Sequence, residues 1–208
     1  MTRPRASRTL ENELRRRGYV HVAGVDEVGR GCLAGPVVAA AVILQADQYV
    51  PGVADSKVLT AEDRERLFPE ITRAAVAWAA AVVSADEIDR LNIHRASLQA
   101  MREAIASLVP LPGFVLVDGF RIPDLVMPQR PIVGGDRRST AIAAASILAK
   151  VTRDRLMLEL HARDPRYGFD RHKGYATKDH LDAVGRHGYS TAHRRSFRPP
   201  SLFDTIAH

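Results

Sequence analysis

Short apolar runs that end at glycine, proline or acidic residues alternate along the chain with longer segments whose apolar residues recur at helical spacing. The apolar runs predict strands at residues 20–25, 36–44, 75–84, 114–117 and 131–133, although the alanines of 75–84 would also suit a helix. The helical spacing predicts helices at residues 6–18, 60–73, 85–91, 93–108, 139–163 and 178–187. The first two strands form a hairpin or an adjacent pair, so we expect an α/β fold with a mixed sheet flanked by helices.

The 208 residues are enough for one well-buried domain. We expect a basic N-terminal arm at residues 1–17, a core at 18–164, and a C-terminal helical segment with a basic tail at 165–208. No linker rich in proline, glycine or serine divides the chain, so the core and the C-terminal segment are expected to form one structural unit. The basic stretch at residues 193–200 is expected to be a solvated tail.

The formal net charge of +6 at pH 7 favours a polyanionic partner. The single cysteine, Cys32, excludes an internal disulfide and a cysteine-rich zinc site, and we expect a packed thiol rather than a nucleophile. No apolar run is long enough to predict a membrane span, and the arginine-rich N-terminus lacks the apolar core of a signal peptide. We therefore expect a cytoplasmic protein, and a monomer because no coiled-coil seam stands out.

Acidic residues follow three of the predicted strands. Asp26 and Glu27 follow the first strand, Asp118 follows the fourth, and Asp136 follows the fifth after a pair of glycines. Because the ends of neighbouring strands converge in an α/β sheet, we expect these carboxylates to form one oxygen-rich pocket that suits Mg²⁺ or Mn²⁺. Two such ions about 4 Å apart can clamp the attacking and leaving oxygens of a phosphodiester.

Each acid also has a purely structural interpretation. The first two can belong to a polar turn after a strand, Asp118 forms a good turn pair with the glycine after it, and Asp136 can cap the helix that starts near Ser139. Asp154 lies four residues after Lys150 on the same predicted helix, where a solvated ion pair is the expectation. Their joint placement at strand ends is what favours the metal site for the other acids.

The turn Gly29-Arg30-Gly31 is a candidate binding element. Its glycines leave the backbone open to a ligand, and its arginine is suited to phosphate. Further along, Tyr175 lies among lysines and arginines, where it can stack on a base or a sugar. An ordinary polar loop before a helix has the same composition.

Two weaker signals also concern phosphate. Lys57 follows an Asp-Ser turn, and Asn92 can cap a helix whose first turn holds a phosphate. No Walker-type loop, Gly-x-Ser-x-Gly elbow or His-Glu-x-x-His motif occurs in the sequence. Nucleotide hydrolases, serine hydrolases and zincins are therefore disfavoured.

The order of these motifs resembles the signature of bacterial ribonuclease HII. The resemblance covers roughly residues 18–200, and its most specific parts are the first motif and the alanine-rich helix. The matching stretches are Asp-Glu-Val-Gly-Arg-Gly at 26–31, Ala-Gly-Pro-Val-Val-Ala-Ala-Ala-Val at 34–42, Asp-Ser-Lys at 55–57, Asn-Ile at 92–93, Val-Asp-Gly at 117–119, Gly-Asp at 135–136, Ala-Ala-Ala-Ser-Ile-Leu-Ala-Lys-Val-Thr-Arg-Asp at 143–154, Lys-Gly-Tyr-Ala-Thr at 173–177 and His-Arg-Arg-Ser-Phe at 193–197.

The resemblance implies a ribonuclease H-like fold and divalent-metal-dependent endonucleolytic cleavage of RNA in RNA/DNA duplexes. The implied substrates include single ribonucleotides embedded in duplex DNA, cut on their 5′ side to leave 3′-hydroxyl and 5′-phosphate ends, as in ribonucleotide and RNA primer removal. Asp26, Glu27, Asp118 and Asp136 match the family's metal-binding acids. Two Mg²⁺ or Mn²⁺ ions would activate a water for in-line attack and stabilise the leaving 3′-oxygen.

The resemblance also assigns substrate contacts. Residues 29–31 match the turn that senses the 2′-hydroxyl at the RNA–DNA junction, and Tyr175 matches the aromatic that stacks on the deoxyribose after the ribonucleotide. The chain departs from the family at two places. Gly134 stands where a lysine usually precedes Gly-Asp, and Val58 follows Lys57 where a second lysine is common. These departures bear on backbone binding and remove no metal ligand.

Two rival interpretations make different predictions. In a non-catalytic binding module the acids are turns and caps, and nucleic acid is bound without divalent metal and never nicked. Another ribonuclease H-like enzyme, such as a junction resolvase or an integrase-type nuclease, would cleave all-DNA substrates. The Gly-Arg-Gly turn argues against this second rival, because a backbone reader of the 2′-hydroxyl is suited to RNA.

Overall fold

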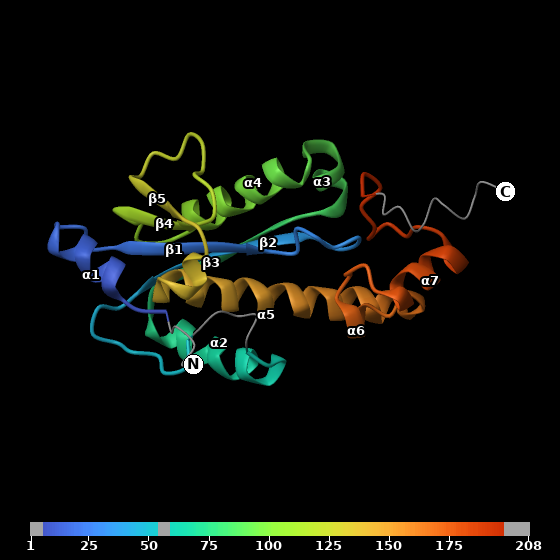
Figure 1. Cartoon of the computed structure of the whole chain (residues 1–208), viewed down its shortest axis with the longest axis horizontal. Helices are drawn as coiled ribbons and strands as arrows, with labels where there is room; N and C mark the ends of the chain where they lie inside the picture. Colours follow the sequence, from blue (N-terminus) through green and yellow to red (C-terminus); the bar gives the residue numbers. More distant parts are fainter. Residues whose placement is uncertain (1–5, 54–58, 198–208) are drawn as a thin grey trace.

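The computed structural model describes residues 6–53 and 59–197, and its centre is a five-stranded sheet in the order β3-β2-β1-β4-β5 (Figure 1). The strands are β1 (Val22–Val28), β2 (Val37–Leu44), β3 (Ala75–Val83), β4 (Phe114–Asp118) and β5 (Gln129–Ile132). The helices are α1 (Thr9–Arg16), α2 (Ala61–Ala74), α3 (Ala85–Leu91), α4 (Ile93–Ala106), α5 (Thr140–Arg163), α6 (Phe169–His172) and α7 (Lys178–His187), with short 3₁₀ turns η1 (Gly135–Arg137) and η2 (Pro165–Tyr167). Within the described residues, no helix has the length and apolar character needed to cross a membrane.

The strand pairing makes the sheet mixed, as predicted. β2 is antiparallel to both β1 and β3, whereas β1 and β4, and β4 and β5, are parallel. One boundary differs from the prediction, because β1 continues through the acids: Asp26 pairs with Ala40 and Glu27 with Ala39. The long apolar run of β2 offers partners to both residues. The acids therefore lie on a paired strand and not in a turn after it.

The last strand also differs from the prediction. β5 ends at Ile132, so Val133 falls outside it and is 82% exposed. β5 is an edge strand, which tolerates Pro131 because only one of its sides takes part in the ladder. The chain then passes through the glycine pair into η1, which carries Asp136.

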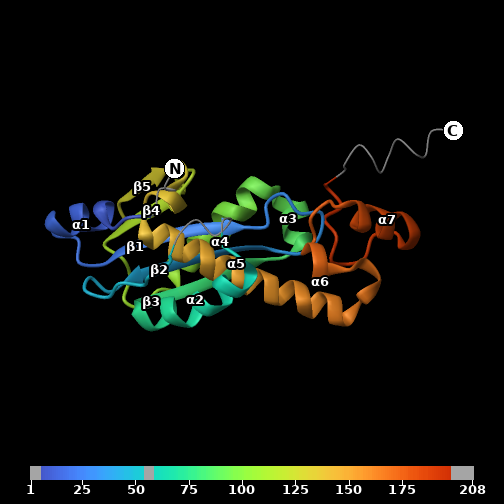
Figure 2. The ribbon, with the colours of Figure 1, turned by 60° about the horizontal axis from the view of Figure 1, so that its bottom comes forward.

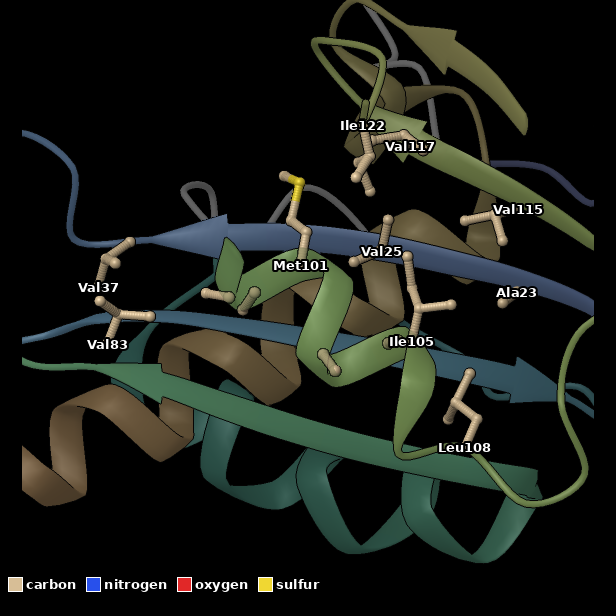
Figure 3. Close-up of a cluster of buried hydrophobic side chains, with 14 of the residues drawn as sticks. Ala23, Val25, Val37, Val83, Met101, Ile105, Leu108, Val115, Val117 and Ile122 are labelled. Carbon is tan, nitrogen blue, oxygen red and sulfur yellow. The ribbon is translucent and has the colours of Figure 1, made fainter. Parts of the chain in front are cut away.

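Helices cover both faces of the sheet, with α4 on one face and α5 and α2 on the other (Figures 1 and 2). On the α4 face, Val25 and Val117 pack toward Met101 and Ile105 (Figure 3). On the other face, α5 approaches β1 so closely that a Cβ at Gly24 would lie 2.2 Å from the carbonyl carbon of Ala141. Glycine and alanine thus bring α5 directly beneath the strand that carries the acids.

Polar side chains cap α2, α5 and α7. Thr60 forms a capping box with Asp63 at the start of α2, and Thr177 accepts a hydrogen bond from His180 N at the start of α7. Ser139 caps α5 by accepting from Ile142 N. The N-cap residue of that helix is therefore Ser139 and not Asp136.

The C-terminal segment packs against the far end of α5 (Figure 2). Met157 of α5 lies in an apolar cluster with Tyr167 and Phe169. Arg153, one turn before Met157, is fully buried and donates to the carbonyl oxygens of Pro36 and Lys173 at 2.9 Å and of Ala34 at 3.1 Å. This one side chain joins α5, the loop before β2 and the C-terminal segment.

A cluster of buried histidines stabilises the C-terminal segment as long as the histidine rings stay uncharged. The rings of His172 and His180 stack with centroids 4.4 Å apart, and His180 Nε2 lies 3.0 Å from His193 Nε2. One of these two nitrogens carries hydrogen and donates to the other. Burial lowers the pKa of His180 and of His193 to about 4.

We expect His180 and His193 to remain neutral in the folded protein until the pH approaches 4. In the unfolded chain both would protonate near pH 6.5. The unfolded chain binds more protons between these values, so their contribution to stability is lost as the pH falls from about 6.5 toward 4. Proton NMR of the histidine rings measures this directly, with the variants His180→Gln and His193→Gln assigning the signals. Ring signals that titrate near 6.5 would contradict the buried, uncharged cluster.

Candidate active site

The two acids of β1 lie in a low-polarity environment. Asp26 is 6% exposed, and its Oδ1 accepts a hydrogen bond from Glu27 N at 2.8 Å. Burial raises the pKa of Asp26 well above its usual value, and the neighbouring carboxylates of Glu27 and Asp118 raise it further. Burial also raises the pKa of Glu27, against the opposing effect of Arg30, whose Nη1 lies 3.4 Å from Glu27 Oε1.

Asp118 lies at the end of β4, the strand parallel to β1. Its Oδ1 accepts a hydrogen bond of 2.6 Å from Gly135 N, which ties the end of β4 to η1. The chain also turns at Gly119, which has φ +73, and Phe120 N donates to Asp118 O at 3.0 Å across this turn. The turn and the carboxylate's position near the other acids are therefore compatible.

Three of the predicted acids share one cavity. Asp26, Glu27 and Asp118 line a hollow of about 380 Å³ together with Lys150 and Tyr175. Among the residues that the structure describes, three more line this cavity: Val28, Arg64 and Ser146. The convergence of strand ends thus brings together Asp26 and Asp118, which are 92 positions apart in sequence.

Asp136 occupies a different position. It is 3% exposed within η1, next to the glycine whose amide contacts Asp118, and it is not among the described residues that line the cavity. Its role as a co-ligand stays a prediction.

The acids suit a hard divalent cation by their chemistry. As the side chains lie, no three His, Cys, Asp or Glu residues in the described part of the chain are arranged to hold a metal ion. An ion would require the carboxylates of Asp26, Glu27 and Asp118 to draw closer together. Carboxylate oxygens are the ligands that Mg²⁺ and Mn²⁺ prefer, and a cation would relieve the burial and the like-charge repulsion that raise the pKa of Asp26.

The Gly-Arg-Gly turn packs against the protein at Gly29 and is open to solvent at Gly31. Gly29 has φ +93, and a Cβ there would lie 2.2 Å from Arg153 Nε, so only glycine fits. A Cβ at Gly31 would meet no atom within 4 Å. Arg194 Nη1 also donates to Arg30 O at 3.0 Å. The turn therefore presents an unobstructed backbone at Gly31.

The basic stretch from residue 193 is not a solvated tail over the part that the structure describes. His193 and Arg194 are 1% and 0% exposed. Arg194 Nε also donates to Gly35 O at 2.9 Å, and burial lowers the pKa of Arg194 to about 10. The sequence prediction was wrong here because carbonyl acceptors from a distant loop supply the hydrogen bonds that water would have made.

The remaining predicted contacts fall in different places. Tyr175 lines the acid cavity, is 42% exposed, and has its pKa raised by burial and then by Cys32. Cys32 is buried, as predicted. Asn92 caps α4 by accepting from Arg95 N, away from this cavity. Lys57 lies outside the described residues.

Comparison with known proteins identifies the family. The model of the family described as Ribonuclease HII matches residues 23–199. This chain belongs to the ribonuclease HII family. A Ribonuclease HII of Nocardia farcinica (strain IFM 10152) is 54% identical over 193 residues, which cover 92% of this chain and 77% of that protein. A Ribonuclease HII of Geobacillus thermodenitrificans (strain NG80-2) is 54% identical over 189 residues, covering 91% and 73%.

Solved structures agree with this assignment. The ribonuclease H2 of Pyrococcus horikoshii OT3 superposes with a TM-score of 0.71 at 25% identity, covering 86% of this chain and 94% of that one. The RNase HII in a PCNA complex from Archaeoglobus fulgidus has a TM-score of 0.71 at 26% identity, covering 88% and 99%. Bst-RNase HIII in complex with Mn²⁺, at 20% identity and TM-score 0.68 over 91% and 70% of the two chains, shows the shared fold.

The ribonuclease HII family consists of metal-dependent endonucleases that act on nucleic acids, so the predicted fold, family and enzyme class are confirmed. Membership thereby rules out a purely binding role for the chain.

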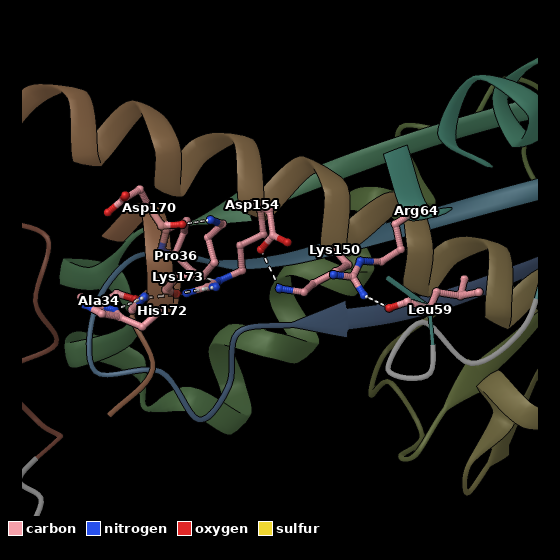
Figure 4. Close-up of polar contacts among 11 residues, drawn as sticks. Ala34, Pro36, Leu59, Arg64, Lys150, Asp154, Asp170, His172 and Lys173 are labelled. Atoms are coloured by element: carbon pink, nitrogen blue, oxygen red, sulfur yellow. Dashed lines mark hydrogen bonds and ion pairs between the residues drawn. The ribbon is translucent and has the colours of Figure 1, made fainter. Parts of the chain in front are cut away.

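Three residues of the cavity were missed by the sequence analysis as site residues: Arg64, Ser146 and Lys150. Lys150 Nζ lies 2.6 Å from Asp154 Oδ1, and Arg64 Nη1 donates to Leu59 O (Figure 4). The predicted ion pair of Lys150 with Asp154 is confirmed, but its side chains are only 18% and 17% exposed and not solvated. The four-residue spacing of Ser146 and Lys150 on α5 was the one available signal, since it places both on one helix face.

Proposed function

We propose that this ribonuclease HII cuts the RNA strand of RNA/DNA hybrids and the 5′ side of single ribonucleotides in duplex DNA, leaving 3′-hydroxyl and 5′-phosphate ends. The observation that carries the proposal is the cavity shared by Asp26, Glu27 and Asp118, directly before a turn whose backbone is open at Gly31. The acids supply the means of hydrolysis, and the turn supplies the choice of RNA.

In this proposal Asp26, Glu27, Asp118 and Asp136 hold Mg²⁺ or Mn²⁺, two ions in the active complex. When bound, the metal supplies an activated water and charge stabilisation for the leaving 3′-oxygen. Gly135 N keeps the Asp118 carboxylate aimed from the end of β4 through its 2.6 Å hydrogen bond. Arg30 offsets part of the negative charge of Glu27 before substrate binds, since its Nη1 lies 3.4 Å from Glu27 Oε1.

Substrate recognition falls to the residues around the acids. The backbone of Gly29, Arg30 and Gly31 reads the 2′-hydroxyl, which distinguishes RNA from DNA. Tyr175 stacks on the deoxyribose that follows the ribonucleotide, and Lys57 and Asn92 bind the phosphate backbone. The positive net charge supports binding to such polyanions. We place this activity in ribonucleotide excision and primer removal by a cytoplasmic monomer.

The proposal is tested by comparing three duplexes, each with Mg²⁺ and with Mn²⁺: all DNA, RNA/DNA hybrid, and DNA with one ribonucleotide. We expect cleavage of the latter two and none of the first, with the cut mapped to the 5′ side of the single ribonucleotide. Cleavage of the all-DNA duplex at a similar rate would indicate a resolvase-type or integrase-type activity instead.

Gly31→Ala should separate substrate choice from folding. The added methyl group meets no protein atom within 4 Å, so the thermal midpoint should be unchanged. It obstructs the approach of the 2′-hydroxyl to the backbone, so cleavage at a single ribonucleotide should slow by on the order of 100-fold. The control is Gly185→Ala on α7, where a Cβ also meets no atom within 4 Å. Equal activity of the two variants would remove the turn from substrate recognition.

A further inference from the structure

A second aromatic side chain lies beside the acids, in a different hollow from Tyr175. Phe120 is two residues after Asp118 and is 61% exposed. Its N donates to Asp118 O at 3.0 Å, and its ring meets His94 edge-on with centroids 5.7 Å apart. A phenylalanine this exposed is held in place by both contacts.

Phe120 lines a hollow of its own. This cavity, of about 190 Å³, is bounded by Glu27, Arg30, Asp118 and Phe120, with α4 as its other wall. Glu27 and Asp118 also line the cavity that contains Tyr175. The acids therefore form the partition between two adjoining hollows, each with one exposed aromatic ring.

The two hollows are lined by helices that cover opposite faces of the sheet. The wall of the Phe120 hollow is α4, and the wall of the Tyr175 hollow is α5, and these helices cover opposite faces (Figures 1 and 2). Consider a substrate strand with its scissile phosphate at the acids and the sugar downstream of the cut on Tyr175. The upstream part of this strand extends from the acids toward α4. Its upstream nucleotides then pass over Phe120.

Positive charge continues along the same wall. Arg95 and Arg102 of α4 line the adjacent hollow of about 470 Å³, with Glu103 as its only acid among the described residues. Glu103 is engaged by Gln99 Nε2 at 2.9 Å. An aromatic ring followed by arginines suits a nucleic-acid strand better than an acidic or purely apolar partner.

We propose that Phe120, supported edge-on by His94, stacks on the nucleotide immediately 5′ of the scissile phosphate, so that the cleaved strand is held by one aromatic ring on each side of the acids. This inference rests on the proposed function and adds a contact on the upstream side. Loss of the ring should weaken substrate binding and leave the reacting groups undisturbed.

The test is steady-state cleavage of a one-ribonucleotide duplex by the wild type, Phe120→Ala and Phe120→Tyr. We expect KM to rise by on the order of tenfold for Phe120→Ala, with kcat and its pH profile unchanged and with KM restored in Phe120→Tyr. The control is Val126→Ala, an apolar side chain 96% exposed in the same β4–β5 connection.

Substrates altered at the nucleotide 5′ of the cut locate the contact. That nucleotide carries the leaving 3′-oxygen and must be kept, so only its base is removed. Wild-type KM should rise when this base is missing, whereas the KM of Phe120→Ala should not change. An unchanged KM in Phe120→Ala would overturn the inference, and it is the result expected if the ring binds a protein partner. In that case, cleavage by the wild type would still uphold the proposed function. Failure of the wild type to cut any ribonucleotide-containing duplex overturns both.

Discussion

Asp118→Asn is expected to cleave a one-ribonucleotide duplex at least about 1000-fold more slowly than the wild type, because an amide replaces a carboxylate that the account assigns to metal binding. The fold should be kept, since an amide oxygen can still accept the hydrogen bond from Gly135 N. Single-turnover rates with saturating Mn²⁺ measure the loss. The matched control is Asp124→Asn, an exposed residue with φ 57 in the following loop, where asparagine is well tolerated.

The same variant should be more stable than the wild type when metal is absent. The carboxylate of Asp118 contributes to the raised pKa of Asp26, so its removal relieves a repulsion between like charges. We expect a gain of about 1 kcal/mol in the free energy of unfolding in EDTA, and little or none in Asp124→Asn. If Asp118→Asn cut as fast as the wild type, Asp118 would not be a metal ligand.

Arg153→Met is expected to lower the free energy of unfolding by about 3–5 kcal/mol. The substitution keeps an unbranched apolar stem but removes the donors to the carbonyl oxygens of Pro36, Lys173 and Ala34, which are left buried without that partner. The hydrogen bonds that are lost join the loop beside the Gly-Arg-Gly turn to the segment that carries Tyr175. Urea unfolding monitored by circular dichroism measures it.

Arg155→Met is the control for that substitution. Arg155 lies two residues further along α5, has a side chain 50% exposed, and pairs with Glu65 at 2.6 Å. Exposed pairs contribute little, so the change should stay within about 1 kcal/mol. An equal loss in both variants would show that the effect belongs to the helix and not to the buried guanidinium.

The part of the site that lies at strand ends was predictable from sequence. An apolar run followed by an acid is a local pattern, and the convergence of parallel strand ends is a general property of α/β sheets, so Asp26 and Asp118 could be placed together. Gly29 of the turn was also predictable, because a position that needs a positive φ or has no room for a Cβ selects glycine at that position of the sequence. The boundary of β1 was missed, since pairing of Asp26 with Ala40 depends on the partner strand.

The arginines and histidines around the site could not be placed by local pattern. Arg194 sits in a run of basic residues that is typical of a solvated surface, yet its hydrogen-bond acceptors are carbonyls more than 150 positions away. Arg153 and Arg155 are likewise indistinguishable by local charge pattern on the predicted helix, although only Arg153 is buried. Burial of a charged side chain depends on which distant backbone groups the fold brings to it, and a single sequence carries no record of that.

The most direct test of the account is the position of Mn²⁺ in crystals of this protein, read from its anomalous scattering. We expect an anomalous peak bound by carboxylate oxygens of Asp26 and Asp118, with those side chains closer together than in the structure described above, and loss of that peak in Asp118→Asn. Peaks found only at acids outside this cavity, with Asp26 and Asp118 unliganded, would contradict it.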